Sequence, residues 1–75
     1  MKFSMKKVTV LLADGFEEIE ALTVVDLLRR AKVYVDTVSI TDDYTVRGAH
    51  GIPVQTEDLI TEIDFKESDM IVLPG

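Results

Sequence analysis

The sequence has no cysteine and no tryptophan, and only 4 glycines and 2 prolines. Without cysteine, the chain forms no disulfide and supplies no thiol of its own for chemistry. Basic residues are also scarce, since 8 Lys and Arg stand against 14 Asp and Glu and leave a net charge of −6. A surface that follows phosphates needs the opposite balance, so we expect no nucleic-acid partner.

Long apolar runs are absent too. None approaches the ~20 residues that a membrane-spanning helix requires, so we expect no membrane partner. The first seven residues lead into a strand-like run without a cleavage-site pattern, which argues against a signal peptide. The simplest expectation is a cytoplasmic protein. The hydrophobic content of 47% in 75 residues predicts one small core with little margin of stability.

The first half of the chain has the pattern strand, helix, strand. Residues 7–13 form a nearly continuous apolar run, typical of a strand covered on both faces. The helix that follows has acids near its start and basic residues near its end, which suits the helix dipole. Residues 33–40 are β-branched and mostly alternating, typical of a second strand, so a right-handed βαβ unit is expected. The predicted apolar face of the helix comprises Ile19, Leu22, Val24, Val25, Leu27, Leu28 and Ala31.

The second half of the chain is less regular. Residues 44–55 contain two glycines and a proline and predict one or two short edge strands. Thr56 is a candidate N-cap for a short helix over residues 56–60. Residues 70–73 predict a third buried strand.

The predicted helices are too few for the predicted sheet. Parallel sheets normally carry helices on both faces, and the third strand would expose an unpaired edge. We therefore expect residues 1–75 to be the N-terminal part of one domain, with the missing C-terminal segment as partner. The alternative is a self-contained small domain that is stabilised by oligomerisation.

Four segments resemble, in order, the DJ-1/ThiJ/PfpI superfamily. Residues 10–20 (VLLADGFEEIE) resemble its first strand and the turn that supports its nucleophile, and residues 25–31 (VDLLRRA) resemble its first helix. Residues 48–52 (GAHGI) are similar to its Gly-Ser-His-Gly-Ile segment, and residues 69–75 (DMIVLPG) to its third strand and following turn. The resemblance implies an α/β fold with a flavodoxin-like, doubly wound, mostly parallel sheet of the class I glutamine amidotransferase type. This chain would hold its N-terminal half.

The resemblance also implies a catalytic arrangement that the chain holds only in part. In the family, a glutamate of the Gly-Phe-Glu-Glu-Ile-Glu segment hydrogen-bonds a cysteine nucleophile, and by position that glutamate is Glu20. The cysteine lies beyond the Leu-Pro-Gly motif and so outside this chain. Backbone N–H groups of the turn that begins at Gly75 would help to form an oxyanion site. No cofactor is expected, and no spacing of His, Cys and acids suggests a structural metal site.

Glu20 has a plain alternative interpretation as a first-turn acid that interacts with the helix dipole. Its place after the carboxyl end of the first strand favours function, because open α/β sheets place their sites there. The crowding of Glu17, Glu18 and Glu20 also favours protonation of one of them. A protonated carboxyl could donate to the thiolate and lower the pKa of the cysteine.

Other positions are expected to be structural. Lys32 stands where relatives usually carry glycine, at a position that often requires left-handed backbone, and Ala49 replaces the common serine. His50 is more typical of a turn or interface than of catalysis, and pairing with an acid of a partner subunit is the favoured interpretation. Asp14 is expected to be a turn residue that could shape the mouth of a pocket.

The leading hypothesis is a cysteine-dependent enzyme or stress protein, completed by its C-terminal segment and assembled as a homodimer or higher oligomer. The thiolate would attack a small carbonyl or peptide substrate, with Glu20 orienting and activating it. Family activities that the resemblance implies include glyoxalase, deglycase, peptide hydrolase, chaperone and peroxide-sensing functions. The thiazole monophosphate biosynthesis name of the ThiJ branch implies little about mechanism.

Two other classes of function are open to this sequence. A receiver-type signalling module would need a phosphorylatable Asp where the third strand ends in Leu73-Pro74-Gly75, and its absence argues against that class. The other class is a non-catalytic binding, chaperone or redox-sensing protein that has the same fold. It would be favoured by a C-terminal segment that lacks the cysteine.

Overall fold

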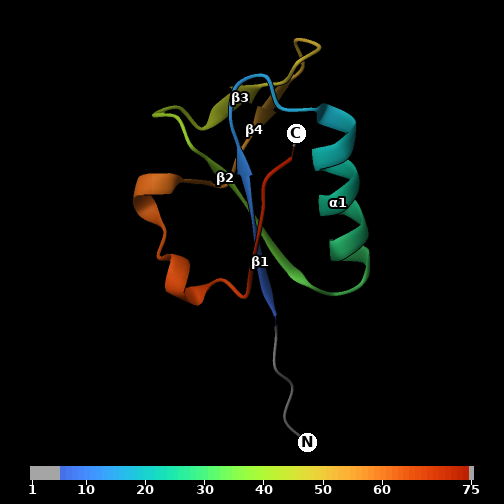
Figure 1. Ribbon diagram of the computed structural model, residues 1–75, viewed down its shortest axis with the longest axis vertical. Coiled ribbons are helices and arrows are strands. Elements are labelled where there is room, and N and C mark those ends of the chain that lie inside the picture. Colours follow the sequence, from blue (N-terminus) through green and yellow to red (C-terminus); the bar gives the residue numbers. More distant parts are fainter. Residues whose placement is uncertain (1–5, 75) are drawn as a thin grey trace, which may run out of the picture.

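The computed structural model describes residues 6–74, in which a parallel sheet carries one long helix along a face (Figure 1). A small antiparallel hairpin lies at one end of the sheet, and two 3₁₀ turns lie on the side opposite the helix (Figure 1). The elements in chain order are β1 (Lys7–Leu12), α1 (Glu18–Arg30), β2 (Tyr34–Ser39), β3 (Thr45–Arg47), β4 (Pro53–Gln55), β5 (Asp58–Leu59), η1 (Ile60–Glu62), η2 (Phe65–Glu67) and β6 (Met70–Val72).

The four-stranded sheet has the order β5-β2-β1-β6, and all of its pairs are parallel. The apolar β1 lies inside the sheet, as its composition predicted, with Lys7 opposite Tyr34 and Leu12 opposite Ser39 on β2. The chain adds β2 on one side of β1 and β6 on the other. The carboxyl ends of β1 and β6 therefore flank a topological switch point, where open α/β sheets place their sites. The predicted α/β fold class is confirmed.

The core lies between the sheet and α1. Val10 and Leu12 of β1 are 0% and 1% exposed, and Ala21 and Val25 of the helix pack against them. Phe16, in the turn between β1 and α1, is also part of this cluster.

The predicted face of α1 is wrong at several positions. Ile19 and Leu27 are exposed, whereas Val25 is buried and Leu28 packs against the core as predicted. The inward face also carries Glu18 and Ala21, which the prediction did not include. Residues spaced by threes drift around a helix of 3.6 residues per turn, so that they cannot all face one sheet. Ala21 is fully buried at the contact between the helix and the sheet.

The hairpin β3–β4 confirms the predicted edge strands, with Val46 opposite Val54. The predicted helix at residues 56–60 is wrong, because β5 occupies residues 58–59 and pairs with β2. Thr56 is not a cap: its buried hydroxyl donates to the Tyr44 carbonyl at 2.7 Å and closes the base of the β3–β4 hairpin.

The third predicted strand forms as β6, but it is not buried. Met70 and Ile71 are 58% and 47% exposed, and within residues 6–74 no strand pairs with the outer edge of β6. Lys32 has the predicted left-handed backbone, with φ of 65°. A lysine costs roughly 1 kcal/mol more than glycine in that conformation.

Candidate functional site

The turn between β1 and α1 lies at the carboxyl end of the sheet. Gly15 has φ of 89°, a conformation that glycine adopts without the steric cost of a side chain. Its N–H donates to the Arg47 carbonyl at 2.8 Å, and the Asp14 carboxylate accepts from the Arg47 N–H at 3.1 Å. Asp14 therefore has the predicted structural role, in which it ties the turn to the hairpin.

Glu20 projects from the first turn of α1 into an open groove between the helix and β6. The groove has a volume of about 510 Å³, and Glu20 is its one charged lining residue. Pro74, the residue before Gly75, lines the same groove. Gly75 itself lies outside the described residues. The remaining lining residues are Ile19, Thr23, Val24, Val72 and Leu73.

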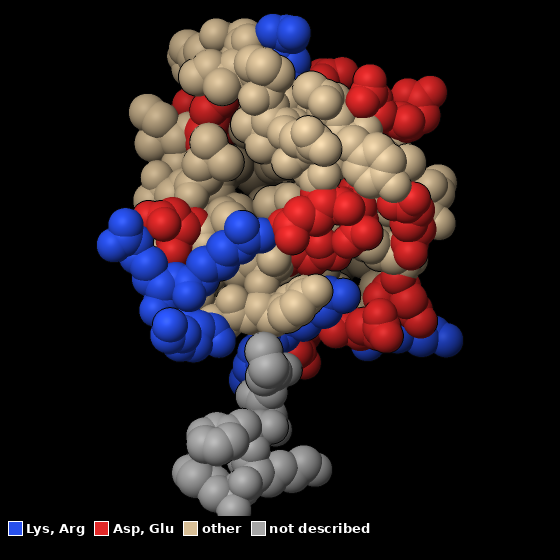
Figure 2. All heavy atoms as spheres, turned by 180° about the vertical axis from the view of Figure 1, so that it is seen from behind, with Lys and Arg blue, Asp and Glu red and all other residues tan. Residues whose placement is uncertain are grey.

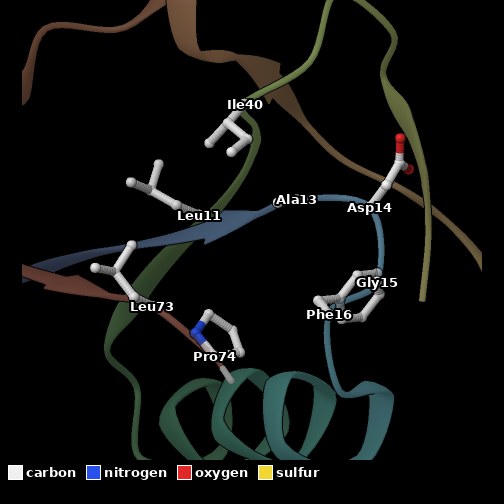
Figure 3. Close-up of a pocket in the computed structure, with 8 residues that line it drawn as sticks. All are labelled: Leu11, Ala13, Asp14, Gly15, Phe16, Ile40, Leu73 and Pro74. Carbon is white, nitrogen blue, oxygen red and sulfur yellow. The ribbon is translucent and has the colours of Figure 1, made fainter. Parts of the chain in front are cut away.

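A second cavity, of about 210 Å³, lies at the end of β1 and shares Leu73 and Pro74 with the groove. Figure 3 shows its mostly apolar lining, with the Asp14 carboxylate turned away from Leu11 and Leu73. Both cavities thus meet at the residues that follow β6. The eight lining residues are Leu11, Ala13, Asp14, Gly15, Phe16, Ile40, Leu73 and Pro74.

Sequence analysis missed the most constrained polar group of this region, which is Glu18. Its side chain is buried although it stands beside the exposed Glu20. The N–H groups of His50 and Ile52 donate to its Oε2 at 2.8 and 3.4 Å, and Nδ1 of His50 lies 2.8 Å from its Oε1. A Cβ at Gly48 would lie 2.5 Å from Oε2, so that glycine makes room for the carboxylate.

The expected protonation of a crowded acid is wrong for Glu18. Burial raises the pKa of Glu18. The hydrogen bonds from the His50 ring and from the backbone N–H groups of Glu18, His50 and Ile52 have the opposite and larger combined effect, so that the pKa of Glu18 is lowered to about 2. The hydrogen bond to Glu18, followed by the charges of Glu18 and Glu17, raises the pKa of His50. Donors thus outweigh burial, and Glu18 is an anion near neutral pH.

His50 contacts an acid of its own chain, Glu18, through Nδ1; its pairing with an acid of a partner subunit stays a prediction. The signal available in the sequence was the helical spacing of Glu18, Ala21 and Val25, which places Glu18 on the buried face. No local pattern links this glutamate to a histidine 32 residues away.

Glu17, Glu18 and His50 offer three possible metal-ligand atoms within 4.8 Å of one another. The spacing of these residues in the sequence did not indicate such a group. Both Glu18 oxygens already accept hydrogen bonds from residues 50–52, and a cation would have to displace a His50 proton. We interpret the group as a hydrogen-bonded cluster.

A different acidic pair lies at the far side of the sheet. Asp36 of β2 is 4% exposed, and the register of β2 with β5 brings Asp58 to the same face. Burial, together with a hydrogen bond and the charges from Asp58 and Glu57, raises the pKa of Asp36 to about 7, although the charge of Lys7 opposes the shift.

Charged side chains are unevenly distributed over the surface. Figure 2 shows acidic side chains spread over the face opposite to Figure 1, with basic side chains gathered near the C-terminal end of α1. Among residues 6–74, no helix has the length and apolar character needed to cross a bilayer.

Known relatives cover the chain almost completely. Protein DJ-1 homolog A of Arabidopsis thaliana is 39% identical over 69 residues, which are 92% of this chain and 18% of that protein. The putative cysteine protease YraA of Bacillus subtilis is 31% identical over 70 residues, 93% of this chain and 41% of that protein. The chain thus spans well under half the length of these relatives.

Solved structures agree with the fold. Oxidized DJ-1 of Toxoplasma gondii matches with a TM-score of 0.89 and 38% identity, over 93% of this chain and 38% of that chain. A mutant DJ-1 superfamily protein of Salmonella typhimurium matches with a TM-score of 0.87 and 41% identity, over 95% of this chain and 38% of that chain. The model of the DJ-1/PfpI family matches residues 6–75. The chain therefore belongs to the DJ-1/PfpI family, as its four sequence segments predicted.

Proposed function

We propose that residues 1–75 are the N-terminal part of a cysteine-dependent DJ-1/PfpI domain that acts on a small carbonyl or peptide substrate, as a hydrolase or a glyoxalase- or deglycase-like enzyme. The observation that carries the proposal is the groove in which Glu20 and the residues after β6 meet. It lies beside the switch point of the sheet, where α/β enzymes bind their substrates.

In the proposed mechanism, the C-terminal segment of the same domain supplies the cysteine. Glu20 donates a hydrogen bond to the thiolate, which holds it in place and stabilises its charge. The thiolate attacks the substrate carbonyl, a C–S bond forms, and the carbonyl π electrons move to the oxygen. Backbone N–H groups of the turn at Gly75 stabilise this oxyanion.

In hydrolysis, the carbonyl then re-forms, the bond to the leaving group breaks, and the Glu20 proton passes to that group. Water hydrolyses the resulting thioester, which releases the acid product and restores the thiolate and the Glu20 proton. Where nothing leaves, the Glu20 proton passes to the oxyanion and gives a hemithioacetal, whose rearrangement and C–S cleavage release the product.

The exposed apolar side chains beside the groove support completion by further chain. Ile19 and Leu73 are 74% and 73% exposed on opposite walls, and such side chains are normally covered when they cluster. Assembly as a homodimer in the cytoplasm is part of the proposal. The Bacillus subtilis relative is named as a putative cysteine protease, which supports the proposed chemistry.

The test is the reactivity of the thiol in the completed protein. Glu20→Gln removes the acid while it retains the side-chain volume, and we expect it to lower turnover of a dicarbonyl or peptide substrate by roughly 10²–10⁴-fold. Iodoacetamide should also alkylate the cysteine more slowly. Glu17→Gln, which removes an acid three residues earlier, is the matched control and should leave both rates nearly unchanged. Equal rates in wild type and Glu20→Gln would contradict the role of Glu20.

A second candidate is a chaperone or binding protein of the same fold. The exposed apolar residues Ile19, Leu27, Met70 and Leu73 favour it, because such residues bind unfolded chains. This function predicts that the protein suppresses aggregation of a denatured client equally well in wild type and Glu20→Gln.

A further inference from the structure

The tip of the β3–β4 hairpin, residues 48–52, rests on the start of α1. The Ala49 N–H donates to the Phe16 carbonyl at 2.8 Å, and the Gly15 N–H donates to the Arg47 carbonyl at 2.8 Å. These two bonds join backbone groups only, which do not titrate, so their strength does not depend on pH. Two carboxylates add side-chain connections: Asp14 accepts from the Arg47 N–H at 3.1 Å, and Glu18 binds the hairpin tip itself.

Glu18 joins the helix to three donors of the hairpin tip. Its carboxylate is buried and accepts from the N–H groups of His50 and Ile52 and from the His50 ring. Gly48 lies so close that any larger residue would overlap the carboxylate. The geometry is therefore built around an ionised Glu18, because a protonated oxygen could not accept all of these bonds equally well.

His50 is the part of this contact that solvent protons can reach. Its side chain is 66% exposed, whereas that of Glu18 is 4% exposed. The other charged groups around it are Glu17, with Oε1 3.8 Å from Nδ1, and Arg47, whose Nη1 donates to the Gly51 carbonyl at 2.7 Å. Asp14 accepts from the backbone of Arg47. The ring itself pairs with carboxylates, since oxygens of Glu18 and Glu17 lie 2.8 and 3.8 Å from Nδ1.

We propose that Glu18, His50 and Gly48 form a proton-controlled clasp that fastens the hairpin tip to the N-terminal end of α1. A charged His50 closes the clasp with an ion pair, and a neutral His50 retains a hydrogen bond to the Glu18 carboxylate but loses the attraction between opposite charges. The clasp uses neither the groove at Glu20 nor a cysteine, so it stands or falls independently of the proposed enzymatic activity.

The pH range of the clasp follows from the two groups. The pKa of His50 is raised in the folded protein, so its contribution is fully present below about 6.5 and is lost as the pH rises through the folded value. The pKa of Glu18 is lowered to about 2, so its contribution is present above about 4.5 and is lost as the pH falls toward 2. The clasp is tightest between about pH 4.5 and 6.5.

The experiment is NMR of the protein in the form in which it is purified, with any completing segment attached. The ring signals of His50 report its titration, and hydrogen exchange reports the protection of the His50 and Ile52 amides. We expect the pKa of His50 to lie above 6.5 in the folded protein. Across this titration the protection factors of both amides, corrected for the intrinsic pH dependence of exchange, should fall about tenfold for each unit by which that pKa exceeds 6.5. The Thr56 amide, which donates to the Tyr44 carbonyl at the far end of the hairpin, is the internal reference and should not change.

His50→Asn is the matched variant, since an asparagine amide retains a donor near the position of Nδ1 but does not titrate. We expect the protection of the Ile52 amide in this variant to be independent of pH between about 5 and 8. Because His50 is exposed, the substitution should leave the fold intact. The proposal is overturned by a wild-type His50 that titrates at or below 6.5, or by protection at Ile52 that varies with pH identically in wild type and His50→Asn.

Discussion

The hairpin tip and the Glu20 groove lie on different sides of the first turn of α1, and they differ in how far their side chains are buried and hydrogen-bonded within this chain. At the hairpin tip, the buried Glu18 carboxylate has three donors, and a glycine makes room for it. In the groove, the apolar walls and Glu20 are open to solvent. The first region is satisfied within this chain, and the proposed function completes the second with further chain. The comparison therefore separates a contact that contributes to stability from the groove in which we propose the chemistry.

A substitution that fills the space beside Glu18 should cause the largest loss of stability. Gly48→Ala places a methyl group against the carboxylate, and the strain together with the displaced donors should cost about 3 kcal/mol of unfolding free energy. Urea denaturation measures this change. Gly51→Ala is the control: Gly51 has positive φ but nothing within 4 Å of its Cβ position, so about 1 kcal/mol is expected. Equal costs for the two variants would show that Gly48 makes no room for Glu18.

Asp36 sharpens the comparison, because it is as buried as Glu18 and has the opposite pKa shift. Burial and its acidic neighbours raise the pKa of Asp36 to about 7. The folded state therefore binds the proton more tightly than the unfolded state, and this contribution to stability is lost as the pH rises from about 4 through 7.

Asp36→Asn removes the charge and retains the shape. We expect it to stabilise the protein by about 1 kcal/mol at pH 8 and to have little effect at pH 4. Thermal unfolding of both proteins across this range measures the difference, with the exposed Asp42→Asn as control. A stabilisation that is the same at both pH values would contradict a titrating Asp36.

The smallest effect on stability is expected in the open region. Leu73→Ser changes a side chain that is 73% exposed, so the free energy of unfolding of this chain should change by less than about 0.5 kcal/mol. Its affinity for the completing segment should nevertheless fall roughly tenfold or more, since a leucine contributes about 1.5–3 kcal/mol when covered. Binding of the separately produced segment, followed by calorimetry, measures this loss.

Val10→Ala is the control for that experiment, because Val10 is fully buried in the core. It should cost about 2 kcal/mol of stability. A Leu73→Ser protein that is destabilised as much as Val10→Ala would show that β6 is already covered, and the division between the two regions would fail.

The sequence predicted those features that local patterns encode. The apolar run of β1, the dipole-matched charges of α1 and the β-branched β2 were sufficient for the βαβ order, and the glycines and proline around His50 were sufficient for the hairpin. The four family segments predicted the family. The position of Glu20 at the carboxyl end of the sheet follows from the same pattern.

The features that sequence analysis missed depend on contacts between distant residues. Glu18 and His50, and likewise Asp36 and Asp58, meet only because the sheet and hairpin bring their elements together. Threonine often caps helices, but in the structure the Thr56 hydroxyl donates to the Tyr44 carbonyl of the hairpin. The inward face of α1 was misplaced because several apolar residues lie on its open side, where Ile19 forms a wall of the groove.

The central claim is that this chain is one part of a domain whose cysteine lies in the other part. Intact-mass spectrometry of the purified, denatured protein, before and after treatment with iodoacetamide, tests it most directly. The account predicts a polypeptide additional to, or continuous with, residues 1–75 that adds roughly 11–13 kDa, as a domain of ordinary size requires, and that gains mass on alkylation. A single species of 8.4 kDa that takes up no label would contradict it, because the groove at Glu20 would then have no nucleophile.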